Sequence, residues 1–204
     1  MICIVDYGMG NLRSVSKAIE HLGAKVEVSS TFRDIERADK IVLPGVGEFG
    51  SAMRELRNRS LIEPIRSHID KNKPFLGICL GLQLLLDRSE ESSRAAGLSI
   101  IPGTVRALKN QIKTSLKVPQ MGWNQVRFTR KSLLTKNLSE RESFFYFVHS
   151  FYAKPADQSS VLGITDYGIK FASILEREPV FAVQFHPEKS QRAGLKILEN
   201  FISY

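Results

Sequence analysis

Short apolar runs alternate with amphipathic segments through the first half of the chain, and this alternation limits the fold more than any other feature. Four runs have the length of buried strands and are bounded by turn residues. They are Ile2–Val5, Val26–Val28, Lys40–Leu43 and Pro74–Ile78. Strands that alternate with helices are typical of βαβ units, so the sequence predicts an α/β fold with a mostly parallel central sheet flanked by helices.

The segments between these runs carry apolar residues three and four positions apart, as amphipathic helices do. The first follows Asn11, a residue type that caps helices, and stops at Gly23. A second helical pattern covers residues 48–72 with an interruption near Pro64, and a third covers residues 80–87. The first two patterns supply the crossovers that parallel strands need.

The pattern changes after Gly97, where short strands and turns replace helices. The expected strands are Ser99–Ile101, Thr104–Leu108, Asn124–Phe128, Ser143–His149, Val161–Thr165, Ile169–Leu175 and Val180–Phe185. The turn residues Asp166 to Gly168 predict a hairpin, and a closing helix is expected over Gln191–Ile202. No repeat or linker divides the chain, so we expect one domain over residues 1–204, with additional antiparallel strands in its second half.

The net charge of +8 comes from one region of the sequence. Between Glu91 and Glu140 there are nine basic residues and no acidic one, whereas the two signs nearly balance elsewhere. Only Trp123 and Phe128 in that window could stack on bases, and base-stacking modules interleave more aromatic residues. We therefore expect no nucleic acid partner. The window is either a solvated face or a docking surface for an acidic partner or a phosphorylated ligand.

The sequence also argues against membranes, disulfides, metals and nucleotide cofactors. No apolar run reaches the roughly 18 residues of a membrane helix, and the first residues have a strand pattern rather than that of a signal peptide. Cys3 and Cys79 are too few for a disulfide framework, and with the four histidines they show no metal-ligand spacing. The segment Gly8–Arg13 lacks the third glycine of a dinucleotide-binding motif. We expect a cytoplasmic protein with no metal and no cofactor.

The segment Gly77-Ile-Cys-Leu-Gly81 places a cysteine between an expected strand and an expected helix. Small residues two positions before and two positions after the cysteine give the spacing of a nucleophile elbow. A thiol at a helix N-terminus is favoured as the thiolate, and the backbone N–H of Leu80 is free to hold an oxyanion. Cys79 is therefore the candidate nucleophile. Cys3 lies among isoleucines and is expected to pack in the core.

A catalytic cysteine needs a base, and His186 is the best placed of the four histidines. It follows an apolar strand pattern, and Glu188 comes two residues later. A loop at the end of that strand can aim His186 at Cys79 while Glu188 fixes the tautomer of the ring, which is the logic of a catalytic triad. His21 and His68 lie in polar helical stretches and are expected at the surface.

Two further segments are candidates for the same site. His149 ends an aromatic strand pattern and is expected to line the site. The glycine-rich loop Pro44–Gly47 follows another strand and can present backbone N–H groups to developing negative charge.

These residues resemble the class I (triad) glutamine amidotransferases, whose nucleophile and His/Glu motifs match Gly77–Gln83 and Phe185–Glu188. The whole chain is similar to one branch of that family, the glutaminase subunits of imidazole glycerol phosphate synthases. The segments that carry this similarity are Ile4–Leu12, Leu43–Gly47, Met121–Asn124, Tyr146–Ser150 and Pro187–Ser190.

The resemblance implies hydrolysis of glutamine to glutamate and ammonia in histidine biosynthesis. The ammonia would pass to a (β/α)8-barrel partner, the cyclase subunit, which forms imidazole glycerol phosphate and an aminoimidazole carboxamide ribotide. The two chains would form a heterodimer. By the same resemblance, Cys79 attacks the γ-amide, His186 carries the proton and Glu188 orients His186.

The remaining roles also come from the resemblance. The N–H groups of Val46 and Leu80 would hold the oxyanion. The residues expected to bind glutamine are Gly45, Gly47, Gln83, Glu91, His149, Ser150 and Phe151, and those expected to face the partner are Trp123, Tyr146 and Lys189.

Three other functions remain open at this point. A related glutaminase could feed ammonia to a different synthase, for example one that aminates a surface sugar. A cysteine hydrolase could act alone on γ-glutamyl bonds, although Met121–Asn124 and Pro187–Ser190 match partner-docking positions of the family. A regulatory module without activity is disfavoured because all three triad positions are filled.

Overall fold

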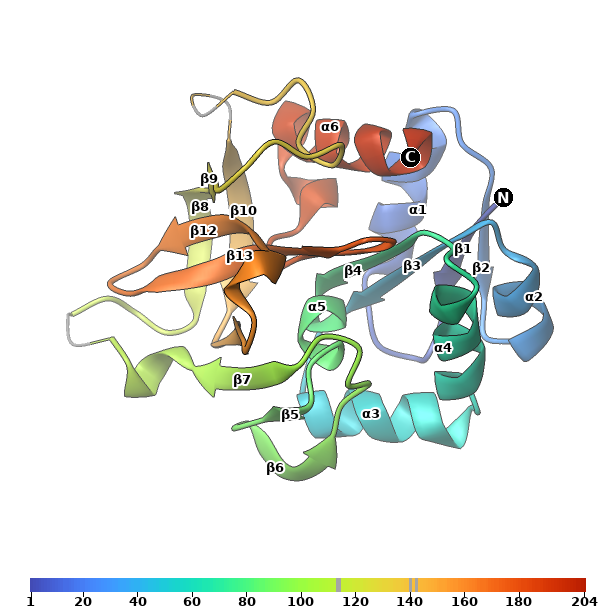
Figure 1. Cartoon of the computed structure of the whole chain (residues 1–204), viewed down its shortest axis with the longest axis horizontal. Coiled ribbons are helices and arrows are strands. Elements are labelled where there is room, and N and C mark those ends of the chain that lie inside the picture. The colour runs from blue at the N-terminus through green and yellow to red at the C-terminus, as the bar shows by residue number, and fades with distance from the viewer. Residues whose placement is uncertain (113–114, 140, 142) are drawn as a thin grey trace.

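Parallel strands form the centre of the molecule, as the alternating sequence pattern predicts (Figure 1). In the computed structural model, which describes residues 1–204 except 113–114, 140 and 142, the main path of the large sheet has the order β2-β1-β3-β4-β14-β13-β11-β7-β5-β6. Its parallel part consists of β2 (Val26–Ser29), β1 (Ile2–Val5), β3 (Lys40–Gly45), β4 (Phe75–Cys79) and β14 (Val180–Val183). Because β14 pairs with β4, the segment before His186 lies beside the strand that ends at Cys79.

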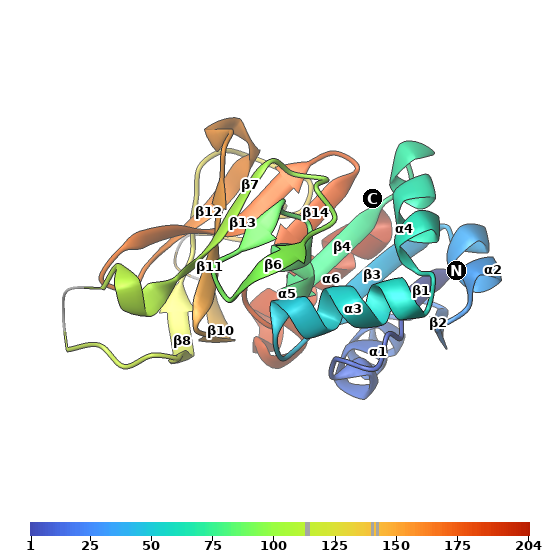
Figure 2. The same cartoon turned by 90° about the horizontal axis from the view of Figure 1, so that it is seen from below.

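Helices cover both faces of this parallel part (Figure 1, Figure 2). One face is covered by α1 (Leu12–His21) and α6 (Gln191–Ser203), which contact each other. The other face is covered by α3 (Phe49–Asn58) and α4 (Ile62–Asp70), and α2 (Phe32–Arg37) packs against α4. The short helix α5 (Leu80–Leu84) follows β4 directly and contacts α3. Alternate strand residues enter separate cores, so each face of the sheet is buried, as parallel sheets require.

The second half adds antiparallel strands to the large sheet and forms a small sheet of its own. From β14 the large sheet continues through β13 (Lys170–Arg177), β11 (Phe151–Pro155) and β7 (Gly103–Ala107), and β12 (Val161–Asp166) is the hairpin partner of β13. The small sheet joins β8 (Gln120–Gln125) to β10 (Phe144–His149). The remaining short elements are β5 (Arg88–Ser89), β6 (Ser92–Ala96), β9 (Arg127–Phe128) and the 3-10 turns Leu108–Asn110, Gln158–Ser160 and Pro187–Lys189.

Several local expectations are confirmed. The side chain of Asn11 caps α1 by accepting a hydrogen bond from the backbone N–H of Ser14 at 3.4 Å. Asp166 pairs with Lys170 across the turn between β12 and β13, so the hairpin forms where the turn residues predict it.

Helix boundaries differ from the expectations at three places. Pro64 does not interrupt a helix but lies in the first turn of α4, where its missing N–H would have no intrahelical acceptor. The break falls instead before α4, where Ser60 adopts a φ of 57°. The helix after Cys79 ends at Leu84 rather than at residue 87, and the backbone N–H of Asp87 bonds to the carbonyl oxygen of Gly103 instead of to the helix. The helix α2 lacks a recognisable pattern because its six residues complete fewer than two turns.

Strand assignments in the second half are less accurate. Ser99–Ile101 is not a strand, and the N–H groups of Ile100 and Ile101 bond instead to the carbonyl oxygen of Leu85. The expected strand Asn124–Phe128 is split between β8 and β9. The strands β5, β6 and β11 were not expected, since β5 has two residues, β6 is mostly polar and β11 follows β10 after one residue, Ser150.

His68 is a further correction, because it is buried rather than exposed. Its Nε2 lies 3.0 Å from the carbonyl oxygen of Pro74, and burial lowers the pKa of the ring to about 4. His68 lies on the buried side of α4, whereas the polar residues Glu63, Arg66 and Asp70 of the same helix are exposed.

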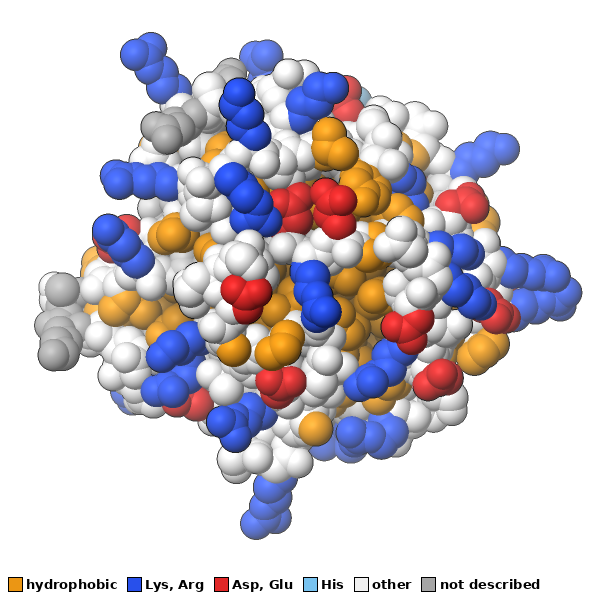
Figure 3. All heavy atoms as spheres, viewed as in Figure 1, with side chains coloured by type: hydrophobic (Ala, Val, Ile, Leu, Met, Phe, Trp, Pro, Cys, Tyr) orange, Lys and Arg blue, Asp and Glu red, His pale blue; other side chains and the backbone are white. Residues whose placement is uncertain are grey.

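On the face shown in Figure 3, basic side chains are scattered rather than gathered in one patch, and acidic and apolar side chains lie between them. Lys113 within the acid-free window and Glu140 at its end lie outside the described residues. Two arginines of the window form ion pairs with glutamates outside it. Arg106 pairs with Glu90 at 2.7 Å, and Arg130 pairs with Glu176 at 2.9 Å. Among the described residues, no helix is long and apolar enough to cross a membrane.

Candidate active site

Cys79 lies on a strained turn between β4 and α5. Its φ of 55° and ψ of −106° place a residue other than glycine in a left-handed conformation that costs free energy. A Cβ on Gly81 would lie 1.9 Å from the carbonyl oxygen of Leu43, and one on Gly77 would lie 2.8 Å from that of Gly81. The close approach of β3, β4 and α5 therefore requires both glycines. The turn has the form of a nucleophile elbow.

His186 and Glu188 form a buried pair in the segment after β14. Nδ1 of His186 lies 2.9 Å from Oε1 of Glu188, and the two side chains are 3% and 1% exposed. Burial is the largest single influence and disfavours the charged ring, but hydrogen bonding and negative charge at the Cys79 sulfur, together with Glu188, outweigh it and raise the pKa of His186 to about 9. Within the described part of the chain, Nε2 of His186 has no hydrogen-bond partner, so this atom is available for proton transfer.

A cavity of about 310 Å³ lies beside Cys79, at the carboxyl ends of β3 and β4. Its lining joins the loop after β3, the elbow, and the junction of β10 with β11. The lining residues are Val46, Gly47, Cys79, Gln83, Glu91, Pro119, Val148, His149, Ser150 and Phe151. The cavity thus brings together most of the residues that sequence similarity assigns to glutamine binding.

The other expected site residues lie behind the cavity wall. Gly45 is buried beside Cys79 in the β3–β4 register, and a Cβ there would lie 2.3 Å from the hydroxyl of Tyr7. Leu80 is 2% exposed at the start of α5. His186 and Glu188 are buried as described above and do not line the cavity.

A chain of hydrogen bonds runs along one side of the cavity. Nε2 of Gln83 donates to the carbonyl oxygen of Phe151 at 3.0 Å and to Oε1 of Gln184 at 3.3 Å. The ring of His149 places Nδ1 2.8 Å from the same carbonyl oxygen and Nε2 3.1 Å from the side-chain amide of Gln120. Burial lowers the pKa of His149 to about 4, so the ring is neutral at physiological pH.

Glu91 contributes a carboxylate to the opposite side of the cavity. Its Oε2 accepts a hydrogen bond from the backbone N–H of Phe49 at 2.8 Å, which ties the carboxylate to the start of α3. Burial raises the pKa of Glu91.

Sequence reasoning missed two buried residues next to the thiol. Nε2 of Gln184 lies 3.7 Å from the sulfur of Cys79, and Gln184 is fully buried. The hydroxyl of Tyr7 has no partner among the described residues, and burial together with the nearby Cys79 raises the pKa of Tyr7. Both residues are distant from Cys79 in the sequence, so no motif spacing joins them to it. The only local signal was the position of Gln184 two residues before His186.

The outer face of the β8–β10 sheet is apolar and exposed. Met121, Trp123 and Phe144 are 65%, 48% and 47% exposed. Trp123 and Tyr146 pair across the two strands with ring centroids 6.2 Å apart in an edge-to-face arrangement, and Nζ of Lys189 lies 6.0 Å from the Tyr146 ring. The three residues expected to face a partner therefore lie together on this face.

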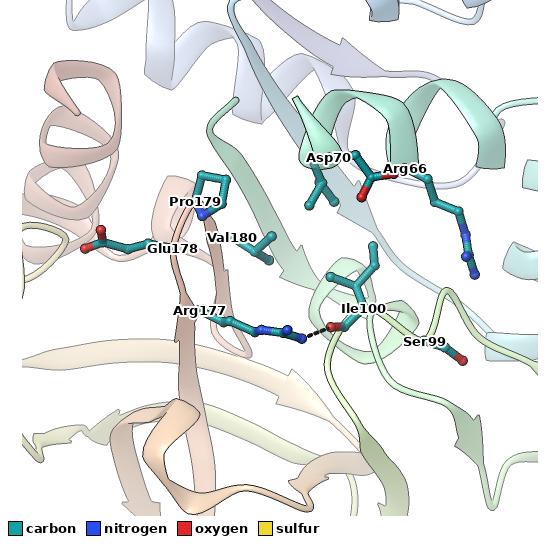
Figure 4. A pocket seen from close by; sticks show the side chains of 9 residues that line it. Arg66, Asp70, Ser99, Ile100, Arg177, Glu178, Pro179 and Val180 are labelled. Carbon is teal, nitrogen blue, oxygen red and sulfur yellow. Dashed lines mark hydrogen bonds between the residues drawn. The ribbon is translucent and has the colours of Figure 1, made fainter. Parts of the chain in front are cut away.

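A second hollow of about 310 Å³, shown in Figure 4, is lined by charged side chains such as Arg66, Asp70 and Arg177. Arg177 donates a hydrogen bond to the carbonyl oxygen of Ile100 at 2.8 Å (Figure 4). This hollow lies at the amino end of β14, near Val180, whereas sites in parallel sheets form at the carboxyl ends of strands. It is therefore separate from the site at Cys79. The described residues contain no cluster of three or more His, Cys, Asp or Glu side chains that could hold a metal ion.

Known proteins resemble this chain in sequence and in fold. The family model for glutamine amidotransferase class-I matches residues 3–203. The imidazole glycerol phosphate synthase subunit HisH of Aquifex aeolicus is 52% identical over 199 residues, which cover 97% of this chain and 94% of that protein. The subunit of the same name from Chlorobaculum tepidum is 47% identical over 205 residues, with both chains covered completely.

Solved structures with lower sequence identity share the fold. A crystal structure described as a glutamine amidotransferase superposes with a TM-score of 0.74 at 16% identity, covering 100% of this chain and 98% of that one. The structure of PurLQS from Thermotoga maritima gives the same TM-score at 18% identity, with coverage of 100% and 97%.

Proposed function

This chain belongs to the glutamine amidotransferase class-I family, and we propose that Cys79, His186 and Glu188 are the residues with which it hydrolyses glutamine. It is the glutaminase subunit of an imidazole glycerol phosphate synthase and releases glutamate and ammonia. One observation carries the assignment of the residues. A thiol on an elbow, a buried His–Glu pair and a cavity meet at one edge of the parallel sheet.

In the proposed reaction the Cys79 thiolate attacks the γ-amide carbon of glutamine, and the carbonyl electron pair moves onto oxygen. His186 is protonated at neutral pH because its pKa is raised to about 9, so it can donate that proton to the leaving nitrogen. The C–N bond breaks, ammonia leaves, and a thioester to Cys79 remains. Water gives a proton to His186, attacks the thioester and releases glutamate, which restores the thiolate–imidazolium pair.

Two backbone N–H groups are placed to hold the oxyanion. Leu80 is the first residue of α5, where the helix itself provides no acceptor for the N–H group. Val46 is 43% exposed in the loop after β3, on the cavity wall beside Cys79. Donors fixed at the point where negative charge develops lower the barrier to amide cleavage.

The cavity offers complementary groups to the amino-acid end of glutamine. Glu91 supplies a carboxylate for the ammonium group. Because Nε2 of Gln83 is already used by Phe151 and Gln184, this residue offers its Oε1 to the same ammonium. The ring nitrogens of His149 are engaged as well, so His149 contributes its main chain, together with Ser150, Phe151 and the backbone at Gly45 and Gly47.

The barrel cyclase subunit is the proposed partner, and the exposed face of the β8–β10 sheet is the proposed docking face of the heterodimer. The carbonyl oxygen of Val148 on β10 lies 4.0 Å from the sulfur of Cys79, so the thiol sits at the edge of that face. Beside Trp123 the face continues into a cavity of about 320 Å³ with Phe144 in its wall and three cations nearby, namely Arg141, Arg192 and Lys196. An apolar anchor with a charged rim is typical of a specific interface.

The direct test replaces the nucleophile. We expect Cys79→Ala to abolish synthesis supplied with glutamine and to retain synthesis supplied with an ammonium salt, because the thiol serves only amide hydrolysis. Both activities are measured on the complex with the barrel subunit, alongside glutamate release.

Cys3→Ala is the matched control. Cys3 is fully buried in β1, and burial is the main influence that raises the pKa of its thiol to about 12, so it does not act as a nucleophile at neutral pH. Cys3→Ala should retain both activities. Equal loss of both activities in Cys79→Ala would remove Cys79 from the glutaminase reaction.

A further inference from the structure

We propose that Gln184 is a further catalytic residue, whose side-chain amide donates a hydrogen bond to the Cys79 sulfur and stabilises the thiolate. Nε2 of Gln184 lies 3.7 Å from the sulfur, within the range of an N–H···S hydrogen bond, and Gln184 is fully buried. The inference rests on the proposed function of Cys79 as the nucleophile, and it adds a residue that the triad does not include.

The orientation of the Gln184 amide follows from its neighbours. The carbonyl oxygen of Phe151 can only accept, so the atom of Gln83 that lies 3.0 Å from it must be the NH₂ group. The second hydrogen of that NH₂ group points to Gln184 at 3.3 Å, and the atom of Gln184 that receives it must be the oxygen. The NH₂ group of Gln184 is therefore the end that faces the sulfur.

The next bonds in the network hold this orientation in place. The Phe151 carbonyl also accepts from Nδ1 of the neutral His149 ring at 2.8 Å, which uses the second lone pair of the oxygen. Nε2 of His149 lies 3.1 Å from Oε1 of Gln120. Because the neutral ring already donates through Nδ1, its Nε2 can only accept, so the Gln120 amide must be turned to present its NH₂ group there. Turning the Gln184 amide over would put its NH₂ group against the NH₂ group of Gln83 and leave these buried donors unpaired, which is unfavourable.

The backbone places Gln184 and His186 for the same task. The backbone N–H of Gln184 bonds to the carbonyl oxygen of Ser173 at 2.9 Å, which extends the β13–β14 pairing beyond Val183. Residues two positions apart on an extended segment project to the same side, and His186 is extended with a φ of −100° and a ψ of 97°. One segment thus delivers two groups that favour negative charge on sulfur, a cation and an amide donor.

The sulfur needs such a donor because it is nearly removed from water. Cys79 is 6% exposed, and the carbonyl oxygen of Val148, 4.0 Å from its sulfur, can only accept a hydrogen bond from the neutral thiol. A buried charge without donors is strongly disfavoured. The side-chain amide of Gln184 supplies that donor.

The test measures how the reactivity of Cys79 depends on pH. Iodoacetamide alkylation of Cys79 is followed by mass spectrometry in wild type and in Gln184→Met, which keeps the shape of the side chain and removes the donor. We expect the midpoint of the alkylation profile to move to higher pH, with alkylation and glutaminase kcat at neutral pH roughly tenfold lower and KM changed less than about twofold. Gln184→Glu replaces the donor by a carboxylate that repels the thiolate, so its midpoint should move further than that of Gln184→Met.

Thr165→Val controls for the loss of a buried hydrogen bond as such. Thr165 lies on β12, which pairs with neither β4 nor β14. Its side chain is 1% exposed and hydrogen-bonds to the side chain of Ser173 at 2.9 Å. Its alkylation profile should match that of wild type. An unchanged profile in both Gln184 variants, or the same shift in Thr165→Val, would overturn the inference.

Failure of the proposed function gives a different result. If the wild-type complex released no glutamate from glutamine, the glutaminase assignment would fall, whereas the alkylation profiles would still report the contact between Gln184 and the sulfur. If wild type is active and the Gln184 variants keep its profile and kcat, only the inference about Gln184 falls.

Discussion

The carboxylate of Glu188 is buried with one oxygen on His186 and the other without a partner among the described residues. Its negative charge is one of the influences that raise the pKa of His186. We expect Glu188→Gln to lower the pKa of His186 and to reduce glutaminase kcat by about 100-fold, less than the loss in Cys79→Ala, because the nucleophile and the oxyanion donors remain. Glutamate release measures kcat, and NMR titration of the His186 ring measures its pKa. A fully active Glu188→Gln protein with a normal far-UV spectrum would show that this carboxylate has no catalytic role.

Stability should depend on pH through three buried histidines. The pKa of His186 is raised from 6.5 to about 9, so its contribution is present below 6.5 and is lost as pH rises through 9. The pKa values of His68 and His149 are lowered from 6.5 to about 4, so their contributions are present above 6.5 and are lost as pH falls toward 4. We therefore expect the free energy of unfolding to peak near pH 6.5.

Urea denaturation across that pH range measures this profile. Glu188→Gln should flatten the alkaline side, and His68→Gln, which removes one of the two low-pKa rings, should flatten the acid side. At about 1.4 kcal/mol for each unit of pKa difference, the stability lost on the alkaline side is at most about 3 to 4 kcal/mol. A profile that rises steadily from pH 6.5 to 9 would contradict the raised pKa of His186.

At the residue scale the sequence predicts the groups that lie in motifs. Cys79, His186 and Glu188 sit at fixed spacings from glycines or from one another, and the structure places them in one buried cluster. Gln184 and Tyr7 have no such spacing, since hydrogen bonding and burial bring them to Cys79 from other strands and loops. Tertiary pairing of this kind leaves no local signal.

At the element scale the packing of α5 against β3 depends on the absence of a side chain at Gly81. A Cβ there would meet the backbone oxygen of Leu43, which cannot move without shifting β3. We expect Gly81→Ala to lower the free energy of unfolding by about 3 kcal/mol and to reduce glutaminase activity, because α5 and the Leu80 N–H would be displaced. Urea denaturation and glutamate release measure the two effects.

Gly50→Ala is the matched comparison, because Gly50 is also helical and its added Cβ would lie 2.8 Å from the hydroxyl and 2.9 Å from the Cβ of Ser92, on the short polar strand β6 rather than in the central sheet. Helix propensity favours alanine over glycine and offsets part of the cost of moving Ser92, so Gly50→Ala should lower the free energy of unfolding less than Gly81→Ala does. Equal stability of the two variants would mean that the elbow tolerates a larger residue.

The elements of the first half were predictable because each buried strand is a continuous apolar run and the longer helices have a clear period. The second half was harder because its strands are short or polar. The sequence of β6, Ser-Ser-Arg-Ala-Ala, has no apolar strand pattern, and the strand is defined by its pairing with β5. The expected interruption of the helix near Pro64 was wrong for another reason. Proline interrupts a helix in its interior but is tolerated in the first turn, where Pro64 lies.

At the scale of the whole molecule, the site lies where two structural parts meet. The parallel sheet supplies Cys79 and His186, and the small β8–β10 sheet supplies Val148 and the exposed aromatic face. The sequence could not predict that β8 and β10 form a sheet of their own, because antiparallel partners about twenty residues apart in the chain carry no mark of their pairing. This arrangement puts the place where ammonia is released next to the proposed docking face.

Ammonia released into water is largely protonated and no longer nucleophilic, so the docking face must seal around the exit. Trp123 is the best anchor for such a seal, being large, 48% exposed and oriented by its contact with Tyr146. We expect Trp123→Ala to weaken binding of the barrel subunit by about 10- to 100-fold, or to uncouple glutamate release from product formation. Phe32→Ala is the control, because Phe32 is also 48% exposed but lies on α2, at the far edge of the large sheet.

Titration calorimetry gives the affinity, and parallel assays of glutamate and product give the coupling ratio. Lys189 lies at the rim beside Tyr146, so Lys189→Ala should change the association rate and its salt dependence more than the affinity. If the chain without its partner hydrolysed glutamine at the full rate, sealing would not be needed for activity. If Trp123→Ala kept both the affinity and a one-to-one ratio while Phe32→Ala lost them, the partner would dock at the opposite edge of the sheet, and ammonia would have to cross open solvent to reach it.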